Sequence, residues 1–423
     1  MKRALVLSGG GSLGAYEMGV WKALRELKMD FQIVTGTSIG ALIGFFVATD
    51  QFDLAFKLWQ NISIEKVINN AVDLDYNEIQ KSVSRDNGKQ LKSVIKSYLK
   101  NRQFDVSPFY ELVNRYIDGS LIANSPITLG TVSVIWPSLK QVNTIINYLP
   151  SNKVQDYLIA SSALFPAFPM RKIDGKNHVD GGYRDNLPIE FALELGADQI
   201  IVVDVFGGRS IFNNPLSKLP IVKTVRPAWN LGSILLFKPE VIERNMSLGY
   251  NDALKAFEKK RGYKFTFHDD EIIEDYGRIY IRNLITINKR LSQRIFDFLS
   301  HDQEWGKKPG DNLLRVLEIV AEAVNVDAQP IYHFMDFIAA IDERIIISEK
   351  IQKDYKNQSA FQKKFGFFRP TRHEMYQIIH LANQKHVNLV KMINKNKDDI
   401  PFVAFAVAAQ VVHNLFSEEY GGK

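Results

Sequence analysis

The chain has 423 residues, of which 46% are hydrophobic and 24% charged, ordinary values for a globular protein. It contains no cysteine, which excludes disulfide bonds, thiolate catalysis and cysteine-ligated zinc. The formal net charge of +6 mildly favours anionic partners such as lipid headgroups. This length predicts two or three domains, with enough apolar residues for a large core.

No segment has the pattern of a signal peptide or a membrane span. The apolar run 4–7 ends at a glycine cluster, too early for the hydrophobic region of a signal peptide. The most apolar stretch, 402–416, is interrupted by polar side chains and falls short of a transmembrane helix. We therefore expect a cytoplasmic protein that has no membrane span and makes at most a peripheral, transient contact with a membrane surface.

The predicted elements alternate between strand and helix from the N-terminus. Residues 3–8 form a short buried strand, 15–27 a helix, 31–35 a second strand and 38–48 an apolar helix. This order is typical of a parallel sheet covered by helices. Further strands are predicted at 127–135, 141–148 and 199–205, and further helices at 154–162 and near 238–260. Residues 50–120 are amphipathic and predict a helical insertion or cap, and residues 285–423 predict a helical C-terminal region.

Ser38 lies in the pattern Gly36-Thr37-Ser38-Ile39-Gly40, between a predicted strand and a predicted helix. A nucleophile elbow needs this context, because the serine sits on strained backbone at a tight turn and flanking glycines allow close approach. The start of the helix adds a partial positive charge that favours an alkoxide or an oxyanion. The alternative is a simple glycine turn, and the strand–turn–helix context favours the nucleophile.

A glycine-rich loop follows the first predicted strand, with the sequence Gly9-Gly10-Gly11-Ser12-Leu13-Gly14. It matches a dinucleotide-binding fingerprint, but that site needs an acidic residue at the end of the second strand. Asp30 precedes that strand, which argues against a dinucleotide. The favoured interpretation is an oxyanion hole, since adjacent glycines expose backbone N–H groups to a tetrahedral intermediate.

Asp180 is the best candidate for the base that activates the serine. It follows a predicted strand and precedes Gly181 and Gly182, which allow the backbone to crowd a reacting centre. Taken alone, the same residues also fit an ordinary Asp-Gly turn. Among the eight histidines only His178 is a plausible alternative base, and it is the weaker candidate.

Taken together, these three motifs resemble the patatin-like phospholipase family, in order and at similar spacing. The resemblance covers roughly residues 1–260 and extends to Ala160–Pro169, Asn186–Ile189 and Leu195–Asp198. It implies an α/β fold, a three-layer sandwich with a mostly parallel central sheet, followed here by the largely helical region 285–423. Its motif glycines would be Gly9, Gly14, Gly36, Gly40, Gly181 and Gly182.

The resemblance also implies a function, that of a lipid acyl hydrolase of the phospholipase A or lysophospholipase type. Ser38 would attack the ester and form an acyl-enzyme, and Asp180 would act as base in a dyad without histidine. The backbone N–H groups of Gly10, Gly11 and Ser12 would hold the oxyanion. The substrate would be a phospholipid or another acyl-ester lipid. No metal, cofactor or nucleic acid is implied, and the oligomeric state stays open.

Some features depart from the family pattern or stay unexplained. Leu13 stands where the family usually carries a basic residue, which leaves headgroup preference open. Arg184 and Asp185 predict either a local ion pair or a headgroup contact. Two alternative functions therefore remain. One is an effector activated by a membrane or a partner through residues 285–423. The other is an acyl-binding protein with a degenerate hydrolase site.

Overall fold

The computed structural model describes residues 1–69, 104–207, 214–287, 308–341 and 343–344. It divides the chain into two compact units, Met1–Phe257 and Glu258–Lys423. The predicted helical insertion at 50–120 is described only at its two ends. Most of the predicted helical region 285–423, with its apolar stretch 402–416, lies outside the described residues.

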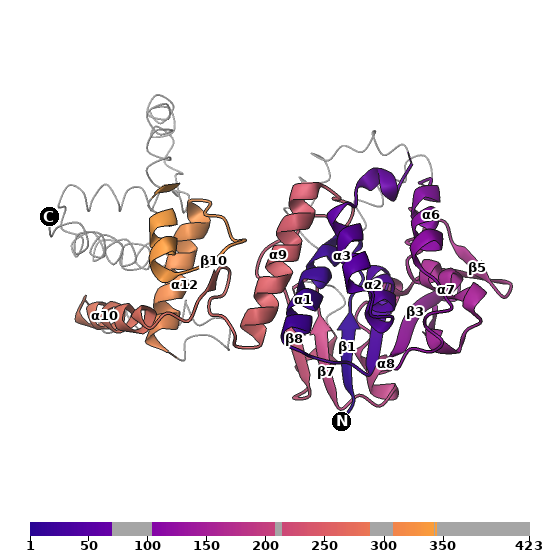
Figure 1. The fold of residues 1–423 in the computed structure, drawn as a ribbon, viewed down its shortest axis with the longest axis horizontal. Coiled ribbons are helices and arrows are strands. Elements are labelled where there is room, and N and C mark those ends of the chain that lie inside the picture. Colours follow the sequence, from indigo (N-terminus) through magenta and orange to yellow (C-terminus); the bar gives the residue numbers. More distant parts are fainter. Residues whose placement is uncertain (70–103, 208–213, 288–307, 342, 345–423) are drawn as a thin grey trace. The chain divides into compact units, whose positions relative to one another are not determined.

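An eight-stranded sheet forms the centre of the first unit (Figure 1). Its strand order is β5-β6-β3-β2-β1-β7-β8, and β4 pairs with β3. Neighbours from β3 through β2, β1 and β7 to β8 are parallel, whereas β4, β5 and β6 pair antiparallel. The predicted α/β class with a mostly parallel sheet is therefore confirmed. The strands are β1 Arg3–Leu7, β2 Ile33–Thr37, β3 Thr128–Trp136, β4 Lys140–Ile145, β5 Arg171–Ile173, β6 Lys176–Asp180, β7 Gln199–Val203 and β8 Val222–Val225.

Helices cover both faces of this sheet, because alternate side chains of its buried strands point to opposite sides. Ala4 and Val6 share a buried cluster with Ile189 and Ala192 of α8. On the other face, Val34 and Leu129 pack against Gly44 of α2. These helices and strands therefore form three layers. The helices of the unit are α1 Gly14–Glu26, α2 Ile39–Ala48, α3 Phe52–Gln60, α6 Ser107–Tyr116, α7 Val154–Ser161, α8 Ile189–Glu194 and α9 Pro239–Ala256.

Helix α9 is joined to the sheet layer through α1, and the two helices lie side by side (Figure 1). The Tyr16 hydroxyl of α1 donates a hydrogen bond of 2.9 Å to Asp252 of α9. Asp252 also forms a buried ion pair with Lys255 at 2.9 Å. A buried carboxylate needs such partners to offset its desolvation. The helix predicted near 238–260 thus belongs to the packed core of the first unit.

The structure departs from the predicted elements at the sheet edge. The strand predicted at 141–148 ends at Ile145, and a 3-10 turn follows over Ile146–Tyr148. The reason is the Asn147 side chain, which bonds backbone groups of Ile122, Ile127 and Leu129 and so competes with strand pairing. Strands β5 and β8, of three and four residues, were not predicted, because their periodicity is too short to recognise. Strand β6 is the strand expected before Asp180, and it covers Lys176–Asp180.

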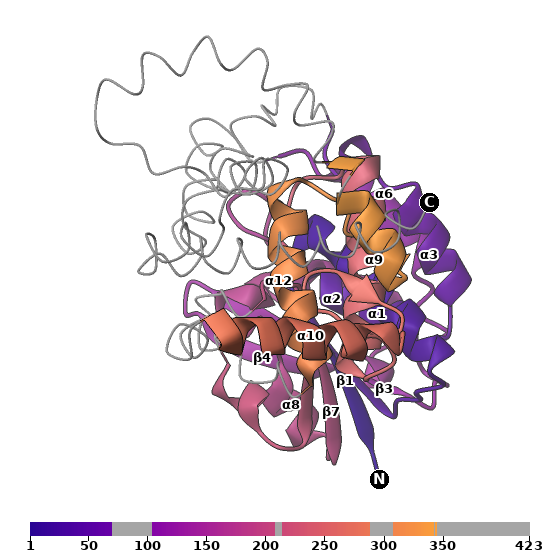
Figure 2. The same cartoon turned by 90° about the vertical axis from the view of Figure 1, so that its left-hand side faces the viewer.

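In its described part, the second unit contains two long helices, a shorter helical segment over residues 334–341 and a short parallel strand pair. Helix α10 covers Ile272–Ile287 and α12 covers Pro309–Ala323, and the two helices cross (Figure 2). Strand β9, Thr266–Phe267, pairs with β10, Ile331–Tyr332. Aromatic side chains pack against this strand pair, and Phe337 contacts Phe265 and Phe267.

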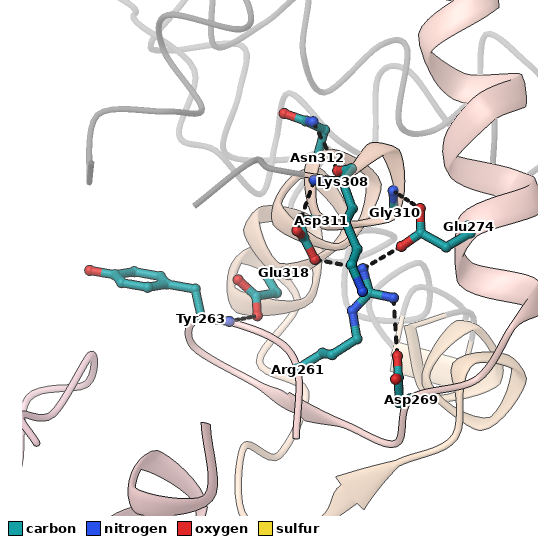
Figure 3. A network of polar contacts seen from close by, with 9 residues as sticks. All are labelled: Arg261, Tyr263, Asp269, Glu274, Lys308, Gly310, Asp311, Asn312 and Glu318. Carbon is teal, nitrogen blue, oxygen red and sulfur yellow. Dashed lines mark hydrogen bonds and ion pairs between the residues drawn. The ribbon is translucent and has the colours of Figure 1, made fainter. Parts of the chain in front are cut away.

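Arg261 connects both helices of this unit through ion pairs (Figure 3). Its Nη2 atom lies 2.6 Å from Glu274 of α10 and 2.6 Å from Asp311 of α12. Glu318 of α12 is fully buried and accepts backbone N–H bonds from Tyr263 and Phe265. Because each buried charge has partners, this network fixes the strand segment against the helices. Throughout the described segments, every helix is too short or too polar to cross a membrane.

Candidate active site

Ser38 and Asp180 are 142 residues apart in sequence, and one edge of strand β3 brings them together. Strand β2 pairs with the first half of β3 and ends with Thr37 opposite Val132. Strand β6 pairs with the second half in the opposite direction and ends with Asp180 opposite Ser133. Strand β4 pairs with residues 130–135 of β3, so β2 and β6 share the other edge. Their C-terminal ends therefore meet head to head.

Ser38 lies at a strained turn between β2 and α2, as the elbow pattern predicts. Its backbone has φ 55° and ψ −125°, a conformation that residues with a side chain rarely adopt. Helix α2 begins at the next residue, so the partial positive charge of its N-terminus lies beside the serine. The Ser38 N–H donates a hydrogen bond of 2.9 Å to the Ser161 hydroxyl. The hydroxyl of Ser38 is half-buried and reaches the cavity described below.

The glycine-rich loop lies directly against the nucleophile. A Cβ atom on Gly9 would lie 3.0 Å from Cβ of Ser38, so only glycine allows this approach. Gly11 has φ +56°, and a Cβ atom there would lie 2.3 Å from the Ile234 carbonyl oxygen. The N–H groups of Gly10 and Gly11 have no hydrogen-bond partner among the described residues. They are therefore available to an oxyanion.

Ser12 differs from these two glycines. Its N–H donates a hydrogen bond of 2.8 Å to the Ile234 carbonyl, and its hydroxyl donates to the Ser233 carbonyl. Its side chain is buried at 1% exposure and does not line the cavity. An N–H that is already bonded cannot also bind an oxyanion without losing that bond. The prediction that Ser12 is an oxyanion donor therefore needs correction, and two donors remain in place of three.

Asp180 is buried, with 5% of its surface exposed. Burial raises the pKa of its carboxyl to about 6, although hydrogen bonds from the Gly182 N–H and the Ser38 hydroxyl act in the opposite direction. The Gly182 N–H lies 2.7 Å from Oδ1 and fixes the orientation of the carboxylate. The result is a carboxylate that contacts the serine hydroxyl and is more basic than an exposed one.

Asn186 joins the glycine loop to the Asp180 loop, and its contribution was not anticipated from the sequence. Its Nδ2 donates to the Gly9 carbonyl at 3.2 Å, and its own carbonyl accepts from the Gly9 N–H at 3.3 Å. Its Oδ1 lies so close to Gly9 and Gly182 that a Cβ atom on either would crowd it. Asn186 thus ties the glycine loop, which lies against Ser38, to the loop that follows Asp180. The remaining motif glycines, Gly14, Gly36, Gly40 and Gly181, also stand at close contacts in the first unit.

Ser38 and Asp180 open onto an apolar cavity of about 790 Å³. Its wall comes from helices α2, α3 and α6 and from segments near residues 164–168 and 234–237. Apolar side chains dominate the wall, and charged side chains are a minority. Such a cavity is large enough for a drug-sized or lipid-like ligand. The apolar lining includes Leu42, Ile43, Phe46, Leu58, Trp59, Phe109, Leu112, Val113, Leu164, Phe168, Leu235 and Phe237.

The other candidates from the sequence have structural partners. His178 is buried and its Nδ1 lies 3.0 Å from the Ser133 hydroxyl, so it does not act on Ser38. Burial lowers the pKa of this histidine. Leu13 is buried at 3% exposure and does not line the cavity. Arg184 donates to the Leu139 carbonyl, whereas Asp185 accepts from the Leu187 N–H, so the predicted local ion pair is not formed. The predicted headgroup contact stays a prediction.

No cluster of three potential metal ligands occurs in the parts of the chain that the structure describes. The carboxyl groups of the site have other contacts. Asp180 contacts Ser38 and Gly182, and Asp185 bonds the backbone of Leu187. The expectation of no metal and no cofactor therefore stays a prediction.

Glu17 of α1 is a buried carboxyl beneath the glycine loop, and it leads to a stability prediction. Its Oε1 accepts a hydrogen bond of 3.4 Å from the Ser8 hydroxyl, and its Oε2 has no partner among the described residues. Burial raises the pKa of Glu17 well above the ordinary value of 4.5. The folded state therefore holds this proton more tightly than the unfolded chain, and stability declines as the pH rises above that value.

The variant Glu17→Gln stays neutral and escapes this decline. We expect the difference in melting temperature, Glu17→Gln minus wild type, to increase from pH 4.5 to pH 8 when both proteins are unfolded thermally. The exposed Glu194 provides the control, because Glu194→Gln should shift little over the same range. A difference for Glu17→Gln that does not vary with pH would show that this carboxyl is already ionised.

With this geometry in place, comparison with known proteins gives a consistent result. Residues 5–193 match the family model described as "Patatin-like phospholipase". "Lysophospholipase NTE1" of Mycosarcoma maydis is 25% identical over 318 residues, 73% of this chain and 15% of that protein. "Patatin-like phospholipase domain-containing protein 7" of Rattus norvegicus is 27% identical over 208 residues, 48% of this chain and 13% of that protein. The chain thus spans about 15% of the length of the curated relatives it matches.

Two solved structures are also similar to the chain. The crystal structure of VipD from Legionella pneumophila has a TM-score of 0.40 and 14% identity, covering 97% of this chain and 90% of that one. The crystal structure of the type III effector protein ExoU has a TM-score of 0.32 and 11% identity, covering 100% of this chain and 89% of that one.

Proposed function

Because residues 5–193 belong to the patatin-like phospholipase family, we propose that the first unit is a lipid acyl hydrolase that works through a Ser38–Asp180 dyad. The predicted family and its fold are confirmed. The relatives are named as a lysophospholipase and a patatin-like phospholipase domain protein, and these names refer to hydrolysis of lipids. The observation that best supports the dyad is that Ser38 and the buried Asp180 lie where the C-terminal ends of β2 and β6 meet and line the same apolar cavity.

In the proposed reaction, Asp180 accepts the proton of the Ser38 hydroxyl as its oxygen attacks the carbonyl carbon of an acyl ester. The resulting oxyanion is held by the N–H groups of Gly10 and Gly11, each worth about 3 kcal/mol of barrier in comparable sites. Collapse of the intermediate breaks the ester C–O bond, and the proton on Asp180 passes to the departing alcohol. An acyl group then remains on Ser38.

The second half of the reaction repeats these steps with water. Asp180 accepts a proton from a water molecule, and the hydroxide attacks the acyl-enzyme carbonyl. The same two N–H groups hold the second oxyanion. Collapse releases the fatty acid, and the proton on Asp180 returns to the Ser38 oxygen. Atoms and protons balance over the cycle without another reactant.

The substrate we propose is a phospholipid or a related acyl-ester lipid. The apolar wall of the cavity suits an alkyl chain, because each buried methylene contributes about 0.8 kcal/mol. The test is the release of free fatty acid from phosphatidylcholine and lysophosphatidylcholine in mixed micelles. Release at a rate proportional to enzyme concentration supports the proposal. No release from either lipid, or from a p-nitrophenyl ester, would argue for the acyl-binding alternative.

The pH dependence follows from the raised pKa of Asp180, about 6. The base must be ionised to accept a proton, so kcat/KM should be constant above that pH and fall tenfold per pH unit below it. The measurement is a profile of kcat/KM between pH 4.5 and pH 8.

Asp185 provides a control for this profile, because burial also raises its pKa to about 6. It does not line the cavity. The variant Asp185→Asn should therefore keep the wild-type profile. If the acid limb disappeared in that variant, the titration would belong to Asp185 and the assigned base would be wrong.

A further inference from the structure

The end of helix α7 contacts the backbone of both proposed catalytic residues. The Ser38 N–H donates to the Ser161 hydroxyl at 2.9 Å, and the Asp180 N–H donates to the Ala163 carbonyl at 2.9 Å. Two residues further along, the Phe165 carbonyl accepts from the Tyr183 hydroxyl. Ser161, Ala163 and Phe165 thus hydrogen-bond to Ser38, Asp180 and Tyr183, in that order. Tyr183 lines the cavity beside Asp180.

Of the three residues of this segment, Ser161 is the one that acts through its side chain, and it is fully buried. Its hydroxyl accepts from the Ser38 N–H and donates to the Val132 carbonyl at 2.6 Å. Val132 is the residue of β3 opposite Thr37, the last residue of β2. The hydroxyl therefore bridges β2 and β3 at the point where the chain leaves the sheet and turns into the elbow.

The same Val132 carbonyl is a contact point for the Asp180 loop. A Cβ atom on Gly181 would lie 2.4 Å from this oxygen, so the loop packs directly on it. Helix α7 packs against β3 (Figure 1). The Val132 carbonyl and the Ser161 hydroxyl thus lie between the Ser38 turn and the Asp180 loop.

We propose that Ser161 is a positioning residue, which fixes the strained backbone of Ser38 and sets its distance from Asp180. The strain itself gives the reason. A serine with φ 55° keeps this conformation only where its surroundings determine it. Removing the Ser161 hydroxyl leaves the Ser38 N–H unpaired and lets the turn relax, so the nucleophile moves away from the base. This inference rests on the proposed dyad.

The test compares Ser161→Ala with wild type in the full chain. We expect kcat to fall by about 10- to 100-fold, since a displacement of about 1 Å has effects of this size. KM should stay within about twofold, because Ser161 does not line the cavity. The second-order rate of Ser38 labelling by a fluorophosphonate should fall with kcat. A purely structural role would lower stability without this split between kcat and KM.

Ser125 offers a matched control at the opposite end of β3. Its hydroxyl also accepts a backbone N–H, from Ile127, and donates to a backbone carbonyl, of Ala48. The variant Ser125→Ala loses the same types of bond and should keep wild-type kcat and labelling rate. If both variants lost activity in proportion to their melting temperatures, general destabilisation would explain the effect and the proposal would fail.

A second variant covers the case in which Ser161→Ala does not fold. Ser161→Cys nearly keeps the side-chain volume but replaces the hydroxyl by a weak donor and acceptor, so we expect about tenfold lower kcat. Wild-type kcat in either folded variant would overturn the positioning role. An inactive wild-type chain would instead count against the proposed function, so the two failures are distinguishable.

Discussion

Replacing Ser38 with alanine is expected to lower fatty-acid release by at least about 1,000-fold, the effect seen when a catalytic serine is removed. The hydroxyl supplies the attacking oxygen, and Ser38 is the residue whose hydroxyl hydrogen-bonds to Asp180. The measurement is a steady-state assay with a phospholipid or a p-nitrophenyl ester. Activity that persists near the wild-type rate would remove Ser38 from the mechanism.

Alanine retains the strained backbone at this position, which has φ 55°. The variant Ser38→Gly therefore provides a second test, because glycine adopts this conformation without a steric cost. Ser38→Gly should be as inactive as Ser38→Ala, and its melting temperature should be at least as high as that of Ser38→Ala. An inactive but stabilised variant would separate the chemical role of the hydroxyl from the fold of the elbow.

Replacing Asp180 with asparagine is expected to lower kcat by about 100- to 10,000-fold, the range for loss of a general base. The amide keeps an oxygen for the Gly182 N–H bond but cannot accept the proton of Ser38. Any residual activity should lose the acid limb of the pH profile near pH 6, because the titrating group is gone.

Asp185→Asn is the matched control for this substitution. Asp185 is a second carboxyl in the same loop, half-buried, and it also accepts a backbone N–H, from Leu187. It should retain activity within a few-fold of wild type, since it does not line the cavity. Equal losses in the two variants would indicate that the loop needs a carboxylate for its structure, and the assignment of Asp180 as base would not stand.

The sequence predicts the elements that carry long apolar or glycine patterns. Strand β1, helix α2 and strand β7 were found close to their expected bounds, because each is a continuous buried run. The antiparallel strand β5 escaped prediction because it has only three residues at the edge of the sheet. A strand before Asp180 was expected and β6 confirms it, but its pairing and register with β3 could not be derived from the sequence.

The candidate site also contains residues that the sequence predicts from motifs and residues whose contacts it does not predict. Ser38 and Asp180 stand in recognisable motifs, and the structure brings them into contact through the register of β3. The family resemblance implied Ser12 as an oxyanion donor, but its N–H bonds Ile234, more than 200 residues away. Ser161 carries no local signal either, since its role depends on a hydrogen bond to residue 38 across the sheet. Contacts between distant segments decide these roles.

The central claim is that Ser38 is a nucleophile activated by Asp180, and covalent labelling tests it most directly. The full chain is incubated with a fluorophosphonate at pH 8, and the adduct is located by peptide mass spectrometry. We expect one adduct, on Ser38, formed at least about 100-fold more slowly in Asp180→Asn and at the wild-type rate in Asp185→Asn. An adduct on another residue, or equal labelling rates in wild type and Asp180→Asn, would contradict the claim.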